Sequence, residues 1–376
     1  MIQLRSGSTL YQNAWNWLAE DWQRVQENLQ GQEKRFFGKR VLVTGAAGFL
    51  GFNFLHFFSY LNAQPTTSSP VEVVAVDNYL RGKPQWITQL AEVDPHLTLR
   101  RHDITKPWPQ DDLKFDFIIH GASVASPKFY RMYPLETLDA NIIGLRVTLD
   151  LAREHQCESM LYFSSSEIYG DPPTHEIPTK ETYRGHVSCL GPRACYDEGK
   201  RVGETFCWLY SQQYGVPVKM ARPFNNYGPG LRLEDGRVLP DLCRNVLNGS
   251  DPVLYSDGKP TRAFCFASDA LTGYLLVLLS SFNGEPFNVG AADEGEISMK
   301  DLAERVLAAA QSDKKVIHQT SVEQDYLTNN PLRRCPDISK ARDLLGYVPR
   351  VPIGKGLGRM LHWYKNFVDL EKLEEA

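Results

Sequence analysis

The stretch Val41-Leu-Val-Thr-Gly45-Ala-Ala-Gly48-Phe-Leu-Gly51 decides the fold of this chain. Its first three residues form a short apolar run typical of a buried strand, and a helix is expected from 49 to about 61. The glycines between them have the spacing GxxGxxG. Such a loop lets the backbone approach a pyrophosphate, which the free N–H groups of the helix N-terminus attract. The stretch therefore predicts the first strand, loop and helix of a dinucleotide-binding fold.

Strands and helices alternate in the residues that follow. The apolar pattern predicts strands at 71–76, 115–120, 159–164 and 217–221, and helices at 134–155 and 194–214. This alternation predicts an α/β fold, a Rossmann-like doubly wound parallel sheet with helices on both faces. After about Phe224 the chain has loops rich in Gly, Pro and Asp, with short helices near 238–249, 268–281 and 298–311. We expect a dinucleotide-binding domain at 39–223 and a smaller α+β substrate-binding lobe, mainly 224–376.

Residues 1–38 are predicted to be an N-terminal helical extension. Trp15, Leu18, Trp22, Val25 and Leu29 recur at spacings of three and four, which indicates one amphipathic helix over 9–30. Its apolar stripe is expected to pack on the body of the protein or on a second subunit, with binding of another partner as the alternative. Residues 31–38 are interpreted as a linker.

Composition excludes several classes of protein. The chain has 376 residues and a formal net charge of −4, without a basic run that could track a phosphate backbone, so no nucleic-acid partner is expected. The nine histidines and seven cysteines show no metal-ligand spacing, so no metal is predicted. No segment reaches the roughly 18 apolar residues that span a bilayer, and the N-terminus lacks a signal-peptide pattern. With its scattered cysteines, the chain is expected to be cytoplasmic.

Asp77 points to the identity of the dinucleotide. It ends the second predicted strand and is followed by Asn78. A carboxylate at this position can accept hydrogen bonds from the 2′-hydroxyl of an adenosine ribose and would repel a 2′-phosphate. The sequence therefore predicts NAD as the cofactor, rather than NADP.

Tyr196 and Lys200 are the candidate catalytic pair. Four residues apart on a predicted helix, they lie on the same face. A lysine ammonium near a phenol favours the phenolate, and a decrease in tyrosine pKa from about 10 to about 7 corresponds to roughly 4 kcal/mol. Such a tyrosine can accept a hydroxyl proton as hydride leaves the adjacent carbon.

The environment of Tyr196 distinguishes it from two decoys, because Tyr79 with Lys83 and Tyr255 with Lys259 show the same spacing in predicted loops. Only the helix of Tyr196 follows an apolar strand that ends in Ser164-Ser-Ser-Glu167. Carboxyl ends of strands face the cofactor crevice in such sheets, so Ser165 could hydrogen-bond the reacting oxygen beside Tyr196. The alternatives are turn capping for the serines and a surface ion pair for Glu167.

Together these motifs resemble the extended short-chain dehydrogenase/reductase family, of the NAD-dependent epimerase/dehydratase type. The resemblance covers roughly residues 38–366, with the glycine loop, Val76-Asp-Asn78, His102-Asp103, Asn141 with Gly144, Ser164 to Gly170 and Tyr196/Lys200 in the family's order. It implies an NAD-binding first domain and a homodimer formed through two helices of each subunit. The residues that it implies for the cofactor are Gly45, Ala47, Gly48, Phe49, Leu50, Gly51, Asp77, Asn78, Asp103, Ile104, Ala122, Asn141, Tyr196 and Lys200.

Within that family the sequence most resembles the UDP-glucuronate decarboxylase (UDP-xylose synthase) branch. The most specific stretch is Gly191-Pro-Arg-Ala-Cys-Tyr-Asp-Glu-Gly-Lys-Arg201. The resemblance implies that Tyr196, tuned by Lys200 and aided by Ser165, removes the proton from the 4-hydroxyl while hydride passes from carbon 4 to NAD⁺. The 4-keto sugar then loses its carboxylate as CO₂, carbon 5 is protonated, and hydride returns to carbon 4.

The resemblance also assigns roles around the sugar nucleotide. Ser166 and Glu167 would act at the carboxylate and carbon 5, and arginine forks suit phosphate and carboxylate oxygens. The residues implied for substrate binding are Ser126, Tyr130, Asn225, Arg237, Tyr255, Arg262 and Arg334, with Asn225 and Arg334 near the diphosphate. Surface ion pairs are the alternative for the arginines.

Two related activities and one unrelated role remain open. Ser166 stands where 4,6-dehydratases typically carry an aspartic acid, and Glu167 is usually lacking in 4-epimerases, so both residues favour decarboxylation over these alternatives. Gly230 stands where the decarboxylase pattern has an arginine, so substrate contacts are expected to differ. A non-catalytic NAD-sensing regulator is the distant alternative, disfavoured because Tyr196 and Lys200 are both present.

Overall fold

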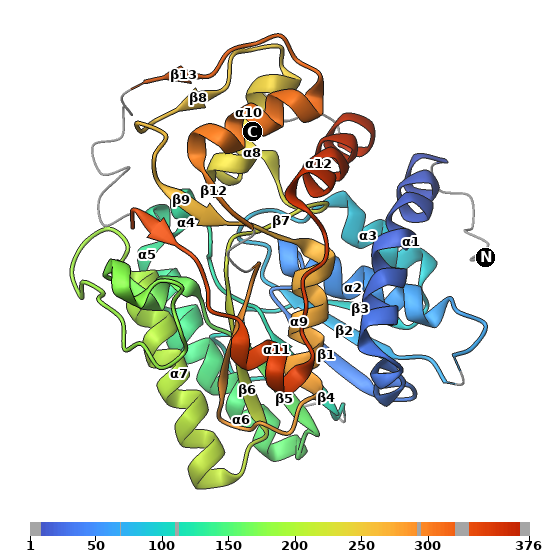
Figure 1. Ribbon diagram of the computed structural model, residues 1–376. Helices are drawn as coiled ribbons and strands as arrows, with labels where there is room; N and C mark the ends of the chain where they lie inside the picture. Colours follow the sequence, from blue (N-terminus) through green and yellow to red (C-terminus); the bar gives the residue numbers. More distant parts are fainter. Residues whose placement is uncertain (1–8, 68, 110–112, 292–294, 320–330, 369–376) are drawn as a thin grey trace.

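A seven-stranded parallel sheet forms the centre of the computed structural model, which describes residues 9–67, 69–109, 113–291, 295–319 and 331–368. The strand order is β11-β6-β5-β4-β1-β2-β3 (Figure 1). This is the predicted α/β, Rossmann-like sheet. Its strands are β1 (Arg40–Thr44), β2 (Glu72–Asp77), β3 (Leu97–Arg101), β4 (Phe117–His120), β5 (Ser159–Phe163), β6 (Val218–Pro223) and β11 (Pro286–Val289).

Helices cover both faces of the sheet, so its central strands are buried on both sides. On one face α2 (Phe49–Asn62) and α9 (Ala267–Leu279) pack with aromatic and aliphatic residues of the main core. On the other face α6 (Leu145–His155) and α7 (Ala194–Tyr214) pack against Leu42, Ile118 and Met160. The loops at the carboxyl ends of the strands lie between this sheet and the C-terminal lobe.

The C-terminal half contributes to both parts of the molecule. Its strand β11 pairs with β6 in parallel register, and α9 covers the sheet, so the sheet is completed only by residues beyond 284. One further element, α11 (Ser339–Leu345), packs against β11 and α9 beside the sheet. The smaller lobe lies in the upper part of Figure 1. Its elements are β7 (Asn226–Tyr227), η5 (Leu233–Asp235), α8 (Val238–Leu247), β8 (Val253–Leu254), β9 (Thr261–Ala263), β10 (Cys265–Phe266), β12 (Glu296–Ser298), α10 (Met299–Ala310), β13 (Ile317–His318), β14 (Arg333–Arg334) and α12 (Ile353–Phe367).

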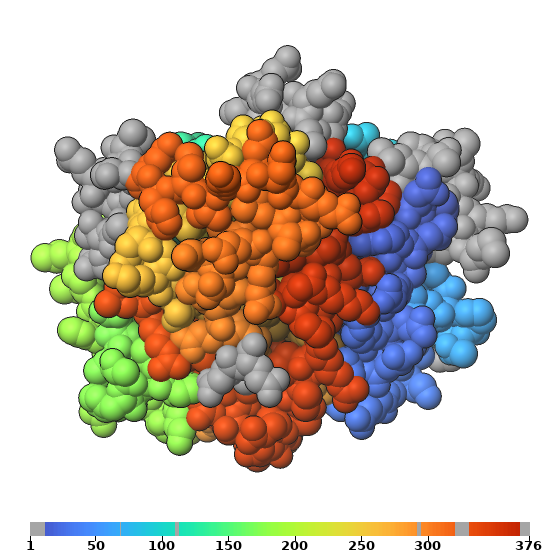
Figure 2. Space-filling view, turned by 45° about the horizontal axis from the view of Figure 1, so that its top comes forward, coloured from blue at the N-terminus to red at the C-terminus, as the bar shows by residue number. Residues whose placement is uncertain are grey.

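The N-terminal helix α1 (Thr9–Leu29) packs on the body of the protein, as its apolar stripe predicted. Trp22, Val25 and Leu29 are almost fully buried in the main core. A buried ion pair between Asp21 and Arg359 joins α1 to α12, with Nη2 of the arginine 2.8 Å from Oδ2. Figure 2 shows the two helices in contact on the surface.

Residues 31–38 are not the simple linker that the sequence suggested. They contain a short 3-10 helix, η1 (Gln32–Phe36). The Phe36 ring is fully buried and packs edge-on against Phe58 and Phe117. A single aromatic side chain therefore fixes this segment against the end of the sheet, which a polar and glycine-flanked sequence did not indicate.

The long helix predicted at 134–155 is interrupted in its middle. It consists of α5 (Pro134–Asp139), one π-helical turn η2 (Ala140–Gly144) and α6. The wide turn places Asn141 directly against Gly199 of α7, where an added Cβ would lie 3.1 Å from the asparagine Cβ. Such π-bulges are frequent at functional sites. The other short helices are α3 (Gln85–Val93), α4 (Pro127–Met132), η3 (Ser166–Tyr169) and η4 (Thr174–Glu176).

Two properties of the described residues bear on function. None of their helices is long and apolar enough to cross a membrane. Within the same part of the chain, no group of three or more His, Cys, Asp or Glu side chains is arranged to hold a metal ion.

Candidate active site

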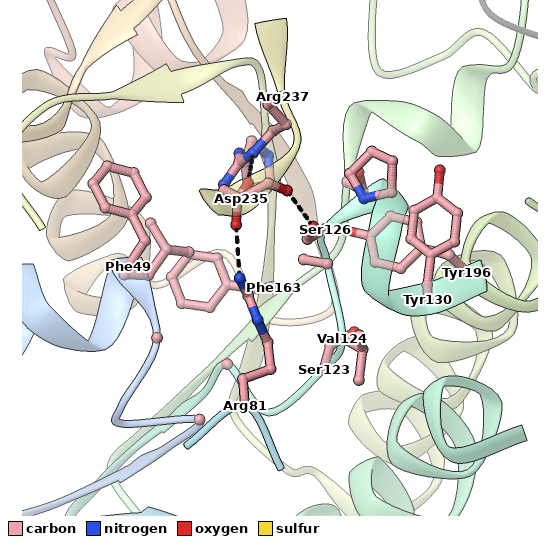
Figure 3. A pocket seen from close by; sticks show the side chains of 18 of the residues that line it. Phe49, Arg81, Ser123, Val124, Ser126, Tyr130, Phe163, Tyr196, Asp235 and Arg237 are labelled. Carbon is pink, nitrogen blue, oxygen red and sulfur yellow. Dashed lines mark hydrogen bonds and ion pairs between the residues drawn. The ribbon is translucent and has the colours of Figure 1, made fainter. Parts of the chain in front are cut away.

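One cavity of about 730 Å³ lies at the carboxyl ends of the strands, between the sheet and the C-terminal lobe. Ligands of open α/β folds bind at this edge. Figure 3 shows side chains from both walls directed into it. The predicted residues that line it are Gly45, Ala47, Gly48, Phe49, Leu50, Gly51, Asp77, Asn78, Asp103, Ile104, Ala122, Ser126, Tyr130, Ser165, Ser166, Glu167, Tyr196, Lys200, Asn225, Arg237, Tyr255, Arg262 and Arg334.

The glycine loop provides close backbone packing and space for a pyrophosphate. Gly45 has a φ of +69°, and a Cβ there would lie 2.5 Å from the carbonyl oxygen of Gly121. A Cβ on Gly51 would lie 2.2 Å from the carbonyl oxygen of Ala46, so side chains are excluded where α2 begins against the loop. A dinucleotide fits this cradle, because the loop and the first turn of α2 both face the cavity.

Asp77 is fixed at the end of β2 by two backbone donors. The N–H of Ala47 donates to Oδ2 at 3.0 Å, and the N–H of Tyr79 donates to Oδ1 at 2.7 Å. Burial raises the pKa of this carboxyl above its ordinary value, although these hydrogen bonds and the guanidinium groups of Arg232 and Arg81 oppose the increase. Asp77 therefore lies at the position where a ribose hydroxyl of NAD would be bound.

Tyr196, Lys200 and Ser165 converge as the sequence predicted. Ser165 lies beside the Tyr196 phenol, and its hydroxyl accepts the N–H of Glu167 at 3.2 Å. The Lys200 ammonium donates to the carbonyl of Phe163 at 2.7 Å and lies 5.7 Å from the centre of the Tyr196 ring. Ser165 thus caps the turn after β5 and lines the same cavity as Tyr196, while its catalytic role stays a prediction.

The pKa of Tyr196 differs from the expected one. Burial raises it to about 12, opposed by the hydrogen bond from Ser165, whereas we expected a decrease caused by Lys200. Burial also lowers the pKa of Lys200 to about 7. Both shifts have one physical cause, because an apolar environment disfavours the phenolate and the ammonium alike. The protonation states of Tyr196 and Lys200 therefore depend on the charge of the molecule that binds beside them.

Glu167 lies at the centre of an arginine cluster. Both of its oxygens accept a bidentate pair from Arg334, at 2.6 and 2.7 Å, and Arg193 forms a second ion pair. Burial alone would raise the pKa of Glu167, but Arg334, Arg193 and Arg262 hold it below its ordinary value. Glu167 is therefore an ionised carboxylate. In the structure Arg334 contacts this glutamate, and its expected position near the diphosphate stays a prediction.

The same cluster perturbs two further groups. Burial and the charge of Glu167 raise the pKa of Asp197 to about 7. Burial and the neighbouring Arg334 lower the pKa of Arg262 to about 9. Three guanidinium groups thus surround one glutamate and one weakly acidic aspartate, which leaves local positive charge suited to an anionic substrate group.

Four more of the predicted residues lie around this centre or behind it. Tyr130 stacks on Tyr196 with ring centres 5.4 Å apart. Arg237 pairs with the buried Asp235, whose backbone carbonyl accepts the Ser126 hydroxyl at 2.5 Å (Figure 3). Asn141 does not line the cavity. It lies behind the catalytic helix, and its side-chain amide donates to the carbonyl of Thr137 at 2.8 Å.

Sequence reasoning did not assign a role to four residues that hold this site together. Arg193 and Asp197 lie within one turn of Tyr196, so their helical spacing could have indicated them. Asp235 precedes Arg237 by two residues and accepts ion pairs from it and from Arg81. No local pattern marks Arg81, because its partner is 154 residues away in sequence.

The fold and site define a class of protein. The chain belongs to the NAD-dependent epimerase/dehydratase family, whose model matches residues 41–290. It is an NAD-dependent enzyme that modifies nucleotide-linked sugars.

Particular relatives carry more specific activities. UDP-glucuronic acid decarboxylase 6 of Arabidopsis thaliana is 37% identical over 335 residues, which cover 88% of this chain and 90% of the relative. UDP-glucuronic acid decarboxylase 1 of Xenopus tropicalis is 38% identical over 331 residues, covering 87% and 72%. Among solved structures, the dTDP-glucose 4,6-dehydratase DesIV of Streptomyces venezuelae with bound NAD has a TM-score of 0.72 at 26% identity, covering 87% of this chain and 97% of that one.

Proposed function

We propose that this enzyme decarboxylates UDP-glucuronate to UDP-xylose through a 4-keto intermediate. The observation that carries the proposal is the arginine cluster around Glu167, because Arg193, Arg262 and Arg334 provide positive charge beside the catalytic Tyr196. A sugar that bears a carboxylate two carbons from the oxidised position is the substrate that uses such charge. The decarboxylase relatives at 37–38% identity support the same substrate.

The residues on the cavity wall suit the first step of this reaction. Tyr196 accepts the proton of the 4-hydroxyl, and Ser165, which lies beside the phenol, favours its ionised form. Bound NAD⁺ supplies the hydride acceptor and later the hydride donor at carbon 4, and its positive ring also favours the phenolate. The Lys200 ammonium lies one helical turn from Tyr196 and provides the second positive charge.

Loss of CO₂ follows from the chemistry of the oxidised sugar. The carbon–carbon bond to the carboxylate breaks, and its electron pair enters the 4-ketone as an enolate. Protonation at carbon 5 restores the ketone, which is then reduced, while Tyr196 returns its proton to the 4-oxygen. Glu167 and Ser166 lie on the turn after β5 and are the groups proposed to act at the carboxylate and carbon 5.

Ser166 and Glu167 also argue against the two related activities. A 4,6-dehydration needs an acid to expel water, and the buried Ser166 has no carboxyl with which to supply a proton. A 4-epimerisation needs no acid or base at carbon 5, whereas Glu167 is held in an elaborate ion-pair network. These two activities remain the alternatives that the product analysis below would identify.

A product assay tests the proposal. Purified protein with NAD⁺ and UDP-glucuronate labelled with ¹³C at carbon 6 is expected to release labelled CO₂ and to give the NMR signals of UDP-xylose. Tyr196→Phe should lower the rate by about 100-fold or more, since general acid–base catalysis contributes that much.

The matched control is Tyr214→Phe, an exposed tyrosine at the end of the same helix, which should leave the rate unchanged. Formation of UDP-galacturonate without CO₂, or of a 6-deoxy-4-keto sugar from a different sugar nucleotide, would contradict decarboxylation and leave the family assignment intact. Retained biological activity in Tyr196→Phe would instead favour an NAD-sensing regulator.

We further propose that the enzyme is a homodimer. The helices α5 and α7 pack side by side and carry exposed apolar residues. Leu135 is 72% exposed and Trp208 is 52% exposed, with Ile143 and Val202 exposed nearby on η2 and α7. Large apolar side chains grouped on neighbouring helices are typical of a subunit interface.

A further inference from the structure

The loop after β2 crosses from the sheet to the C-terminal lobe. Its residues 79–83, here named the strap, begin two positions after Asp77. From the strap, Arg81 reaches the carboxylate of Asp235 in η5, with Nη2 3.2 Å from Oδ1. Figure 3 shows this ion pair spanning the cavity between its two walls. This ion pair binds the strap to the opposite lobe.

Two more contacts fix the strap in this position. The Arg81 guanidinium lies 4.1 Å from the centre of the Phe129 ring on α4. In return, Arg232 of the C-terminal lobe donates to the carbonyl of Arg81 at 2.6 Å. Arg232 and Asp235 both lie at η5, and Phe129 lies on α4, so two separate segments hold the strap and its position does not depend on a single exposed ion pair.

The Asp235 carboxylate is well suited to hold the strap. Its side chain is 3% exposed, and burial alone would raise its pKa. The guanidinium groups of Arg237 and Arg81 outweigh burial and keep the pKa below its ordinary value. Asp235 is thus a buried carboxylate that needs both arginines, and loss of Arg81 would leave it only partly compensated.

The strap lies over the cofactor part of the cavity. Leu80, Arg81 and Gly82 line the same cavity as the glycine loop and Asp77. The N–H of Tyr79 donates to Asp77, so the strap is continuous with the group that would bind the adenosine ribose. The Nε of Arg81 is buried and has no hydrogen-bond partner among the described residues.

We propose that Arg81 retains NAD by closing the strap against Asp235, so that the dinucleotide leaves only after this ion pair opens. Binding of NAD follows from the family, and the need for retention rests on the proposed function. That reaction oxidises and then reduces the same sugar carbon, so the cofactor has to stay through both steps. Arg81 is a positioning residue and takes no part in the chemical steps.

The rate of NAD release tests this role. Protein loaded with NAD⁺ is freed of excess cofactor and mixed with alcohol dehydrogenase and ethanol, which reduce released NAD⁺ and report it by absorbance. Arg81→Met should release NAD at least tenfold faster than the unchanged protein. Arg153→Met is the matched control, because Arg153 also lies over an aromatic ring, that of Tyr214, but outside the cavity.

The outcomes are separable. Release from Arg81→Met within twofold of the unchanged protein overturns the proposal, as does equal acceleration in Arg153→Met. If Arg81→Met does not fold, as judged by circular dichroism, Arg232→Met removes the second anchor and should accelerate release in the same direction. No sugar nucleotide enters the assay, so its result is independent of whether UDP-glucuronate is the substrate.

Discussion

Lys200 is a cation placed where the protein disfavours charge. Its side chain is 3% exposed, and burial lowers its pKa from 10.5 to about 7. Tyr79 and Lys83 form a decoy pair with almost the same separation as the catalytic pair. The Lys83 ammonium lies 5.6 Å from the centre of the Tyr79 ring. That decoy pair lies in the strap and lacks the serine at a strand end, so spacing alone does not create the site.

Burial of the Lys200 ammonium destabilises the folded state, which leads to a prediction about how stability depends on pH. The folded protein releases the Lys200 proton near pH 7, whereas the unfolded chain keeps it to about 10.5. The unfolded state binds more protons between these values, so stability rises with pH across this window. Lys200→Met should therefore raise the free energy of unfolding most below pH 7, by about 2–4 kcal/mol, and progressively less toward pH 10.

Urea unfolding of the enzyme at pH 6.5 and pH 9 measures this difference. Lys314→Met, at an exposed lysine, is the control and should change stability little at either pH. An equal effect of Lys200→Met at both pH values would contradict the assigned burial of a charge. Lys200→Met should also lower the catalytic rate, because active sites often keep groups that reduce stability but are needed for activity.

Individual site residues were predictable from sequence only where local spacing encodes them. Tyr196, Lys200 and Asp77 occupy fixed positions relative to a strand or a helical turn, and all three line the cavity. Arg81 and Asp235 meet through the packing of two lobes, so no local pattern could indicate their ion pair. Glu167 was identified, but the bidentate contact from Arg334 depends on a strand 167 residues later.

At the scale of elements, α1 contributes large buried side chains to the main core beside the helices of the dinucleotide-binding fold. Its Trp22 is 2% exposed, stacks on His56 of α2 and contacts Trp15. Trp22→Ala should lower the free energy of unfolding by about 3–5 kcal/mol, because a large buried aromatic leaves a cavity. Asn13→Ala, exposed on the same helix, is the control.

Thermal or urea unfolding of both variants checks this expectation. A change below about 1 kcal/mol for Trp22→Ala would mean that α1 is only loosely attached to the body. The glycine-loop helix α2 is affected by the loss because the Trp22 ring packs against His56 and Tyr60 of that helix. A decrease in NAD affinity is therefore expected to accompany the decrease in stability.

The boundaries of elements followed the sequence where apolar periodicity was strong. The predicted helix at 194–214 matches α7 residue for residue, and α1 and α2 agree within one residue. The π-turn at Ala140–Gly144 was not predictable, because its widening depends on the close contact of Asn141 with Gly199. The 3-10 helix η1 likewise depends on one tertiary contact, the burial of Phe36.

For the whole molecule, the proposed dimer leads to a prediction about subunit association. Leu135→Glu combined with Trp208→Glu places two charges on the exposed apolar face of α5 and α7. Buried unpaired charges disfavour an apolar interface, so the variant should become monomeric. Size-exclusion chromatography with light scattering should show the mass of two chains for the unchanged protein and of one chain for the variant.

A matched control keeps this test specific. Leu344→Glu introduces the same charge at an exposed leucine on α11, away from α5 and α7, and should leave the mass unchanged. A monomeric mass for the unchanged protein would contradict the dimer. Retention of two chains in the double variant would show that another surface joins the subunits.

The strand β11 has a consequence for how the protein is made. It occupies the edge of the sheet beside β6, and residues of α9 cover the face next to it. While a ribosome is still adding the residues between 224 and 289, the hydrogen-bonding groups of β6 and the apolar surface under α9 are unprotected. A nascent chain of this enzyme therefore has a long interval in which chaperones can bind it, and the sheet closes only late in translation.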